Sequence, residues 1–229
     1  GSAVFAGALE LAALRSVPDS AGVTVGEALD ETLSGLAQLP RRQGGFPVAS
    51  YLEVHIEQGP RLEAAGNAIG AVTGIQGSRR FGVEVLGVEA HAGTQPMRQR
   101  QDALKAACQI VAALEAVMAD ETDRVRFTVG RFEVFPGSPN TVPGRVFFTI
   151  DLRHPEQATI DRLTAAIEPT VAANARGCEV AVEVRASAAP VRFDAELVAL
   201  IRRQASVLGL GHMELLSFAG HDAGPLSRV

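Results

Sequence analysis

The chain has 229 residues, of which 47% are hydrophobic and 21% are charged, and its formal net charge is -5. This composition is that of a globular protein with one large domain or two small ones. The acidic balance, the lack of Trp and the single Tyr argue against nucleic-acid binding, which needs basic surface and stacking aromatic side chains. No apolar run reaches the roughly 18–20 residues of a membrane span, so we expect no membrane association.

The two cysteines, Cys108 and Cys178, have neither the number nor the spacing of a disulfide framework or a zinc site. We expect both to be buried free thiols. Unpaired thiols are typical of a reducing compartment, so the expected location is cytoplasmic.

The first part of the chain predicts a helix, a strand and a short second helix. Apolar residues recur with a helical period over residues 25–39. Residues 51–58 alternate apolar and polar side chains, which predicts a strand. Gly59 and Pro60 end this strand, and residues 61–65 predict a short helix.

From about residue 70 the pattern changes to strands that alternate with amphipathic helices. The predicted order is strand, helix, strand, strand, helix, strand, over residues 79–86, 102–118, 125–134, 145–153, 155–175 and 178–184. This is the order of a ferredoxin-like unit, in which two helices cover one face of a four-stranded antiparallel sheet. We therefore expect an α/β fold in which residues 72–186 form a domain of their own.

The remaining residues flank this unit on both sides. Residues 186–190 are typical of a linker, residues 193–208 predict a helix, and a short apolar run follows at 213–218. The flanks 1–71 and 187–229 each hold too few apolar residues for a core of their own. We therefore expect a single outer domain that is interrupted by the inserted one.

Two histidines occupy positions where they could carry chemistry. His55 lies near the end of a predicted strand, where an imidazole can bind a metal or transfer a proton, although a hydrogen bond to a neighbour is the simpler alternative. His91 lies between a strand and a helix among Ala90, Ala92 and Gly93, small residues that let a ligand approach the backbone. A plain turn is an equal alternative for this second histidine.

Arginines at strand positions are candidates for binding an acid. The predicted strand 145–153 ends at Arg153, whose fork of N–H donors suits a carboxylate. An ion pair with Asp151, on the same face of the strand, is the alternative. Arg79 and Arg80 alternate across another strand, so only one of them can face a given pocket.

Four segments of the chain resemble, in order, the motifs of one enzyme family: "HIEQGP" at 55–60, "HAGTQPM" at 91–97, residues 139–153, and "GHDA" at 220–223. As a set they resemble the carbamoylase and allantoate-amidohydrolase branch of the aminoacylase-like dinuclear metallohydrolases. The resemblance implies an α/β metallohydrolase domain interrupted by a ferredoxin-like lid and dimerisation domain, and hence a homodimer. It also implies hydrolysis of a linear C–N bond in a small acid, of the N-carbamoyl-L-amino acid or allantoate type.

The resemblance implies roles for single residues as well. His55 resembles a ligand to one of two divalent ions, Zn²⁺ or Mn²⁺. His91 resembles the residue that stabilises the oxyanion of a tetrahedral intermediate. Asn140 and Arg153 resemble the pair that holds the substrate carboxylate. Further substrate-binding residues implied in this way are Gln58, Arg80 and His221.

The metal ligands of that family are only partly present. The family has a His-x-Asp pair and an adjacent acidic pair upstream of these motifs, and a further metal-binding His downstream, whereas this chain contains no His-x-Asp and no Glu-Glu. We therefore expect an incomplete metal site, as in a family member that lacks both ends. A non-catalytic relative and an aminopeptidase or deacylase are the alternatives, and His55 in place of a carboxylate argues against the second.

Overall fold

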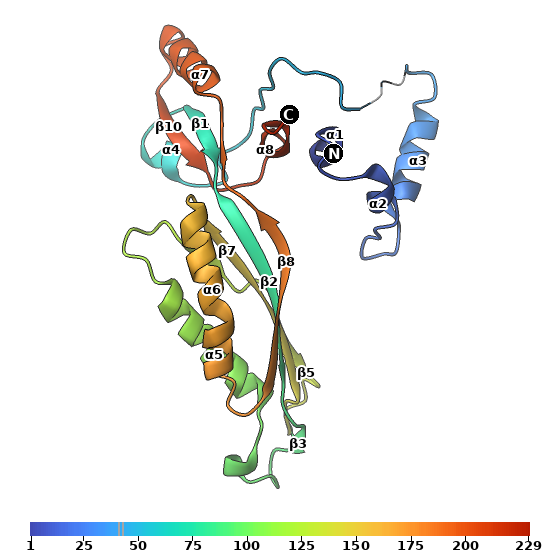
Figure 1. Cartoon of the computed structure of the whole chain (residues 1–229), viewed down its shortest axis with the longest axis vertical. Helices are drawn as coiled ribbons and strands as arrows, with labels where there is room; N and C mark the ends of the chain where they lie inside the picture. Colours follow the sequence, from blue (N-terminus) through green and yellow to red (C-terminus); the bar gives the residue numbers. More distant parts are fainter. Residues whose placement is uncertain (41, 43) are drawn as a thin grey trace. The chain divides into compact units, whose positions relative to one another are not determined.

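The computed structural model describes residues 1–229 except 41 and 43, and Figure 1 traces them in sequence colours. The chain divides into two compact units. One comprises Gly1–Gly74 together with Phe193–Val229, and the other comprises Ile75–Arg192. The domain boundaries expected from the sequence stay predictions, and each unit is described by itself.

The unit Ile75–Arg192 is built on one antiparallel sheet. Its strands are β2 (Gly77–Leu86), β4 (Arg126–Thr128), β5 (Phe132–Phe135), β7 (Arg145–His154) and β8 (Glu179–Ala188). The order across the sheet is β4-β7-β2-β8, and β5 pairs with the other half of β7. Helices α5 (Ala103–Met118) and α6 (Gln157–Ala173) lie side by side on one face (Figure 1). The expected α/β fold and its βαββαβ order are confirmed.

The core of this unit lies between the sheet and its two helices. Alternate residues of β7 are buried, because successive side chains of a strand point to opposite faces. Phe148 lies opposite Val83 in the neighbouring strand, and both are fully buried. The helices contribute their apolar stripes. These buried helix residues are Ala106, Ile110, Leu114, Leu163, Ile167 and Val171.

Several predicted bounds differ from the structure. The strand expected at 125–134 is broken at residues 129–131, around Gly130, so that β4 and β5 pair with different parts of β7. The last strand is longer than expected and takes in most of the linker predicted at 186–190. Cys178 is buried as expected, but the prediction for Cys108 is wrong, because its position on α5 is exposed.

The other unit has a smaller sheet and several helices, most of them short. Its elements are α1 (Ser2–Phe5), α2 (Leu11–Arg15), α3 (Val25–Gly35), α4 (Arg61–Ala64), β1 (Ile69–Ile75), α7 (Ala195–Val207), β10 (His212–Ser217) and α8 (Ala223–Leu226). Strands β1 and β10 are neighbours in the sheet, so the apolar run at 213–218 forms a strand. Thr24 begins α3 with a capping box that includes Glu27, and Asp194 caps α7.

The strand predicted at residues 51–58 is wrong. This segment is extended but belongs to no strand, and its apolar side chains are exposed: Leu52 by 62%, Val54 by 102% and Ile56 by 74%. Alternation gives a strand only where a neighbouring strand supplies hydrogen-bond partners and a face to pack on. The part of the chain that the structure describes supplies neither to this segment. None of the described helices is long and apolar enough to cross a bilayer.

Candidate functional site

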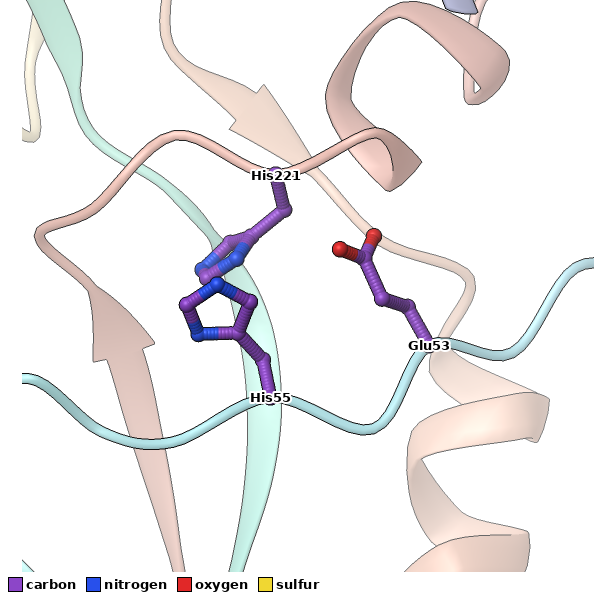
Figure 2. A group of neighbouring side chains, drawn as sticks. All are labelled: Glu53, His55 and His221. Atoms are coloured by element: carbon purple, nitrogen blue, oxygen red, sulfur yellow. The ribbon is translucent and has the colours of Figure 1, made fainter.

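Three side chains of the unit formed by Gly1–Gly74 and Phe193–Val229 form a group with metal-binding character. They are Glu53, His55 and His221, and one ligand atom from each lies within 4.8 Å of the others. Figure 2 shows the two imidazoles edge to face, with the carboxylate beside them. The ring centroids of the two histidines are 4.4 Å apart and the rings are inclined by 75°. The structure therefore brings together two motifs that lie more than 160 residues apart in the sequence.

The hydrogen bond of His55 leaves one ring nitrogen able to act as a ligand. Nδ1 lies 2.7 Å from the carbonyl oxygen of Ile56. A carbonyl can only accept, so Nδ1 carries the proton of the neutral ring and Nε2 keeps its lone pair. The side chain is exposed, so a metal ion or a substrate can reach it.

Ser217 fixes the orientation of His221. The buried Ser217 hydroxyl lies 3.2 Å from both the carbonyl oxygen and the N–H of Ala219, and it also contacts His221 Nε2 at short range. A hydroxyl has one hydrogen and two lone pairs. All three contacts are satisfied if the hydroxyl donates to the Ala219 carbonyl and accepts from the Ala219 N–H and from Nε2–H. This assignment leaves a lone pair on His221 Nδ1.

His221 Nδ1 is buried and has no hydrogen-bond partner among the described residues. Burial lowers the pKa of His221, the neighbouring His55 lowers it further, and Glu53 acts weakly in the opposite direction. A neutral imidazole is the form that binds a metal ion. The unpartnered nitrogen therefore fits a ligand role better than a structural one.

The loop that carries His221 is held in place by polar contacts. Glu53 Oε2 accepts a hydrogen bond from the Ala223 N–H at 2.9 Å, and the Ser2 hydroxyl donates to Asp222 Oδ1 at 2.7 Å. Glu53 and His55 are two residues apart on an extended segment, so their side chains leave it on the same side. This spacing is the signal that could have identified Glu53, which sequence reasoning missed.

Glu57 and Gln58, the acidic and the amide residue of "HIEQGP", have different roles in the structure. Glu57 accepts hydrogen bonds from the N–H groups of Arg61 and Leu62 at 2.9 and 2.8 Å, so it caps the start of α4. Gln58 is exposed and has a positive φ of 55°. Its expected place beside a substrate stays a prediction.

The donor set fits one divalent ion. Two imidazoles and one carboxylate are a set found in catalytic zinc sites, with bonds of about 2.0–2.2 Å. Ligand atoms around such an ion lie up to about 4 Å apart. A small contraction of the present group, whose ligand atoms lie within 4.8 Å of one another, would reach that geometry.

In the unit Ile75–Arg192, Arg80 and Arg153 both bind the carboxylate of Asp151. Arg153 donates to both oxygens of Asp151, from Nε at 2.7 Å and from Nη2 at 2.9 Å, and Arg80 Nε donates to Asp151 Oδ2 at 3.0 Å. Burial acts to raise the pKa of Asp151, but the hydrogen bonds and charges of Arg153 and Arg80 outweigh it and lower the pKa. The hydrogen bond to Asp151 raises the pKa of Arg153, against the effect of burial.

Arg79 points to the other side of the sheet, as the alternation predicts. Its guanidinium donates to Asp161 at 3.0 Å and to Thr164 at 3.1 Å on α6. Of the two adjacent arginines, only Arg80 therefore shares a face with Arg153.

His91 and Asn140 also come together in this unit. His91 lies in β3 (Ala90–His91), which pairs with β6 (Thr141–Val142). The Ala92 N–H donates to the Asn140 carbonyl oxygen at 2.9 Å. Both His91 and Asn140 are exposed.

The two groups of this unit lie at opposite ends of β2. Arg80 is opposite Asp151 in the ladder, and Leu86 is opposite Arg145. The strand rises by about 20 Å from Arg80 to Leu86, at roughly 3.3 Å per residue. The ribbon formed by β3 and β6 begins only beyond that end (Figure 1). One copy of this unit cannot bring Arg153 and His91 to the same small molecule.

Comparison with known proteins finds relatives whose names agree with one another. The family described as "Peptidase dimerisation domain" matches residues 73–179. An N-carbamoyl-L-amino-acid amidohydrolase of Rhizobium meliloti is 37% identical over 97% of this chain and 53% of its own length. An allantoate amidohydrolase of Bacillus subtilis is 32% identical over 92% of this chain and 51% of its own length.

A solved structure agrees with these relatives. An amidase of the hydantoinase/carbamoylase family from Burkholderia vietnamiensis has a TM-score of 0.86 and 40% identity, and the match covers 100% of this chain and 55% of that one. The chain spans about half the length of the relatives it matches. It therefore belongs, over that half, to the hydantoinase/carbamoylase family, in the branch of carbamoylases and allantoate amidohydrolases.

Proposed function

We propose that the full-length protein, which carries this chain within the length spanned by its relatives, is an amidohydrolase. It cleaves a linear C–N bond of a small N-carbamoyl or ureido acid. The observation that supports this most directly is the group of Glu53, His55 and His221, which joins two motifs of a chain that is 37% identical to N-carbamoyl-L-amino-acid amidohydrolases. The substrate class is that of the relatives' names, N-carbamoyl-L-amino acids and allantoate.

The proposed cofactor is a pair of divalent ions, Zn²⁺ or Mn²⁺, with His55 as a ligand to one of them. Bound there, a divalent ion would polarise the substrate carbonyl and lower the pKa of a bound water. His221 lies beside His55 as a substrate-binding residue or as a second ligand. Gln58 follows His55 by three residues and is proposed to contact the substrate.

The second unit would bind and orient the acid. Arg153, oriented by Asp151 and flanked by Arg80, is proposed to bind the substrate carboxylate. His91 is proposed to donate a hydrogen bond to the oxygen that becomes negatively charged. Asn140, which lies beside His91, is proposed to bind the substrate carboxylate together with Arg153.

These roles require two copies of the chain. Arg153 and His91 lie at opposite ends of strands that rise by about 20 Å between them, which exceeds the reach of a small acid. If both groups bind the same substrate molecule, one copy supplies Arg153 and the other supplies His91. We therefore propose a homodimer whose active sites are each completed by both subunits.

The free edge of β8 is the proposed dimer surface. This strand of Glu179–Ala188 pairs with β2 along one side, and the described residues give it no partner strand along the other. An open edge of this length pairs readily with another strand. Antiparallel pairing of β8 with β8 around a twofold axis would cover it and continue the sheet. The match to a family described as a peptidase dimerisation domain supports a second copy as the occupant.

The function can be tested with the full-length protein and a panel of substrates. Hydrolysis of N-carbamoyl-L-amino acids or of allantoate is expected and is measured as ammonia release, whereas dipeptides and N-acetyl amino acids, whose hydrolysis is measured as release of a free amino acid, should not be cleaved. Cleavage of dipeptides alone would contradict the proposal, and no cleavage of any of these substrates with metal bound would favour a non-catalytic relative. We also propose a cytoplasmic location, which localisation of the tagged protein in cells would test.

A further inference from the structure

Arg100 holds the loop that carries His91. Its half-buried guanidinium donates from Nη2 to the Ala92 carbonyl oxygen at 2.6 Å and from Nε to the Gln95 carbonyl oxygen at 3.0 Å. A planar guanidinium that binds two carbonyls three residues apart fixes their relative positions, which a flexible ammonium cannot do. The residues between those carbonyls include Gly93, so the loop conformation at Gly93 depends on Arg100.

Gly93 in turn contacts the imidazole of His91. The Gly93 N–H lies 3.1 Å from His91 Nδ1 and donates a hydrogen bond to it. Because Nδ1 accepts this bond, the proton of the neutral ring lies on Nε2. A Cβ at position 93 would lie 3.2 Å from His91 Cε1, closer than ordinary van der Waals contact, so a side chain at this position would press on the ring.

We propose that Arg100 is a positioning residue: through the carbonyls of Ala92 and Gln95 it holds the Gly93 N–H against His91 and fixes this ring as the Nε2–H tautomer. The fixed donor suits an oxygen atom that gains negative charge. That choice of ligand rests on the proposed function. The tautomer and its dependence on Arg100 do not, because they follow from the hydrogen bonds alone.

The tautomer can be measured directly in the 229-residue chain. The chain contains five histidines, and ¹⁵N-histidine labelling with a His91→Gln variant would assign the His91 ring. In the parent, long-range ¹H–¹⁵N correlations at a pH where the ring is neutral should show the Nε2–H form. In Arg100→Gln, the ratio of Nε2–H to Nδ1–H should fall by about fivefold, the equivalent of one ordinary hydrogen bond.

Two further variants separate the hydrogen-bonding fork from the charge. Arg100→Lys keeps the charge but not the fork, so it should shift the ratio nearly as far as Arg100→Gln. Arg98→Gln is the matched control, because Arg98 is an exposed arginine in the same loop region, and it should leave the ratio unchanged. Exchange of the Gly93 amide hydrogen should accelerate by about fivefold in both Arg100 variants and not in the control.

The outcome distinguishes a positioning role from a merely structural one. If the Arg100 variants lose thermal stability while His91 keeps the parent tautomer, the proposal is wrong and Arg100 only supports the loop. If Arg100→Gln does not fold, the tautomer ratio of His91 in Arg100→Lys tests the proposal instead. Gly93→Ala should shift that ratio in the same direction with Arg100 intact. An unchanged tautomer ratio in both Arg100→Lys and Gly93→Ala would overturn the proposal.

Kinetics of the full-length protein separate this inference from the proposed function. A fall in kcat of about tenfold or more in Arg100→Gln, with KM little changed, would support both. A shifted tautomer with unchanged kcat would leave the positioning role intact and refute the proposed role of His91.

Discussion

Replacement of Arg153 by Lys in the full-length protein separates a substrate-binding role from a structural one. Arg153 makes a bidentate contact with Asp151, with distances of 2.7 and 2.9 Å, and its side chain is 29% exposed. Lysine keeps the charge but cannot reproduce two parallel N–H donors. A substrate-binding role and a structural role therefore both predict an effect of this substitution. The first predicts a change in kcat/KM and the second a change in the free energy of unfolding.

The magnitudes differ enough to decide between them. If Arg153 binds the substrate carboxylate, kcat/KM for N-carbamoyl amino acids should fall by roughly 2–4 kcal/mol, or about 30- to 1,000-fold. The free energy of unfolding should fall by at most about 1 kcal/mol, because the pair with Asp151 is partly exposed to solvent. The core is unaffected, since Leu152 and not Arg153 faces the helices.

The assay is steady-state ammonia release together with urea unfolding of the same variants. Arg131→Lys is the matched control, because Arg131 is likewise paired with a carboxylate two residues away, Glu133. It should leave kcat/KM within about twofold of the parent. An Arg153→Lys enzyme that is less stable but hydrolyses both substrate types as well as the parent would refute the substrate-binding role and show that Arg153 is structural.

Three further predictions follow from single features. Elemental analysis of the dialysed 229-residue chain should find at most about one divalent ion per chain. The reason is that the described residues supply a single group of three possible ligands. A content of about two divalent ions per chain would contradict this prediction. Val184→Lys on the exposed edge of β8, where Val184 is 55% exposed, should weaken dimerisation by at least about tenfold in sedimentation experiments; an unchanged dimer would exclude that edge. The lowered pKa of Asp151 implies stability that is present above the unfolded pKa of about 3.9 and is lost as pH falls through the folded value. Asp151→Asn should therefore flatten the pH dependence of the unfolding free energy below about pH 5, and an equal slope in parent and variant would count against this.

The sequence predicts the unit Ile75–Arg192 well because the apolar residues of its helical pattern and of its strand pattern are buried in the same core. The helical stripe at Ile160, Leu163 and Ile167 is buried, and so are the alternate residues of β7. Local pattern and tertiary packing agree there, which is the condition under which single-sequence reasoning succeeds. The failure at residues 51–58 has the opposite cause. Its alternation is as clear, but an unpaired segment cannot form a ladder whatever its pattern.

The candidate site shows the same division between local and long-range information. The roles of His55, His91 and Arg153 were suggested by motifs, and the alternation of Arg79 and Arg80 was worked out from the strand period. Contacts between distant segments could not be predicted, because nothing in a single sequence states that Glu53 lies beside His221. The distance between Arg153 and His91 along the sheet, from which the two-copy site is inferred, also needed the strand register.

The two-copy active site is tested most directly by mixing inactive variants of the full-length protein. His91→Ala and Arg153→Ala chains should each be inactive alone as homodimers. After unfolding and refolding together in equal amounts, mixed dimers contain one site with both residues intact, so about one quarter of the parent activity should return. Recovery of ammonia release to that level would support an amidohydrolase site shared between subunits. No recovery in a mixture that demonstrably contains mixed dimers, when the parent is active, would contradict it.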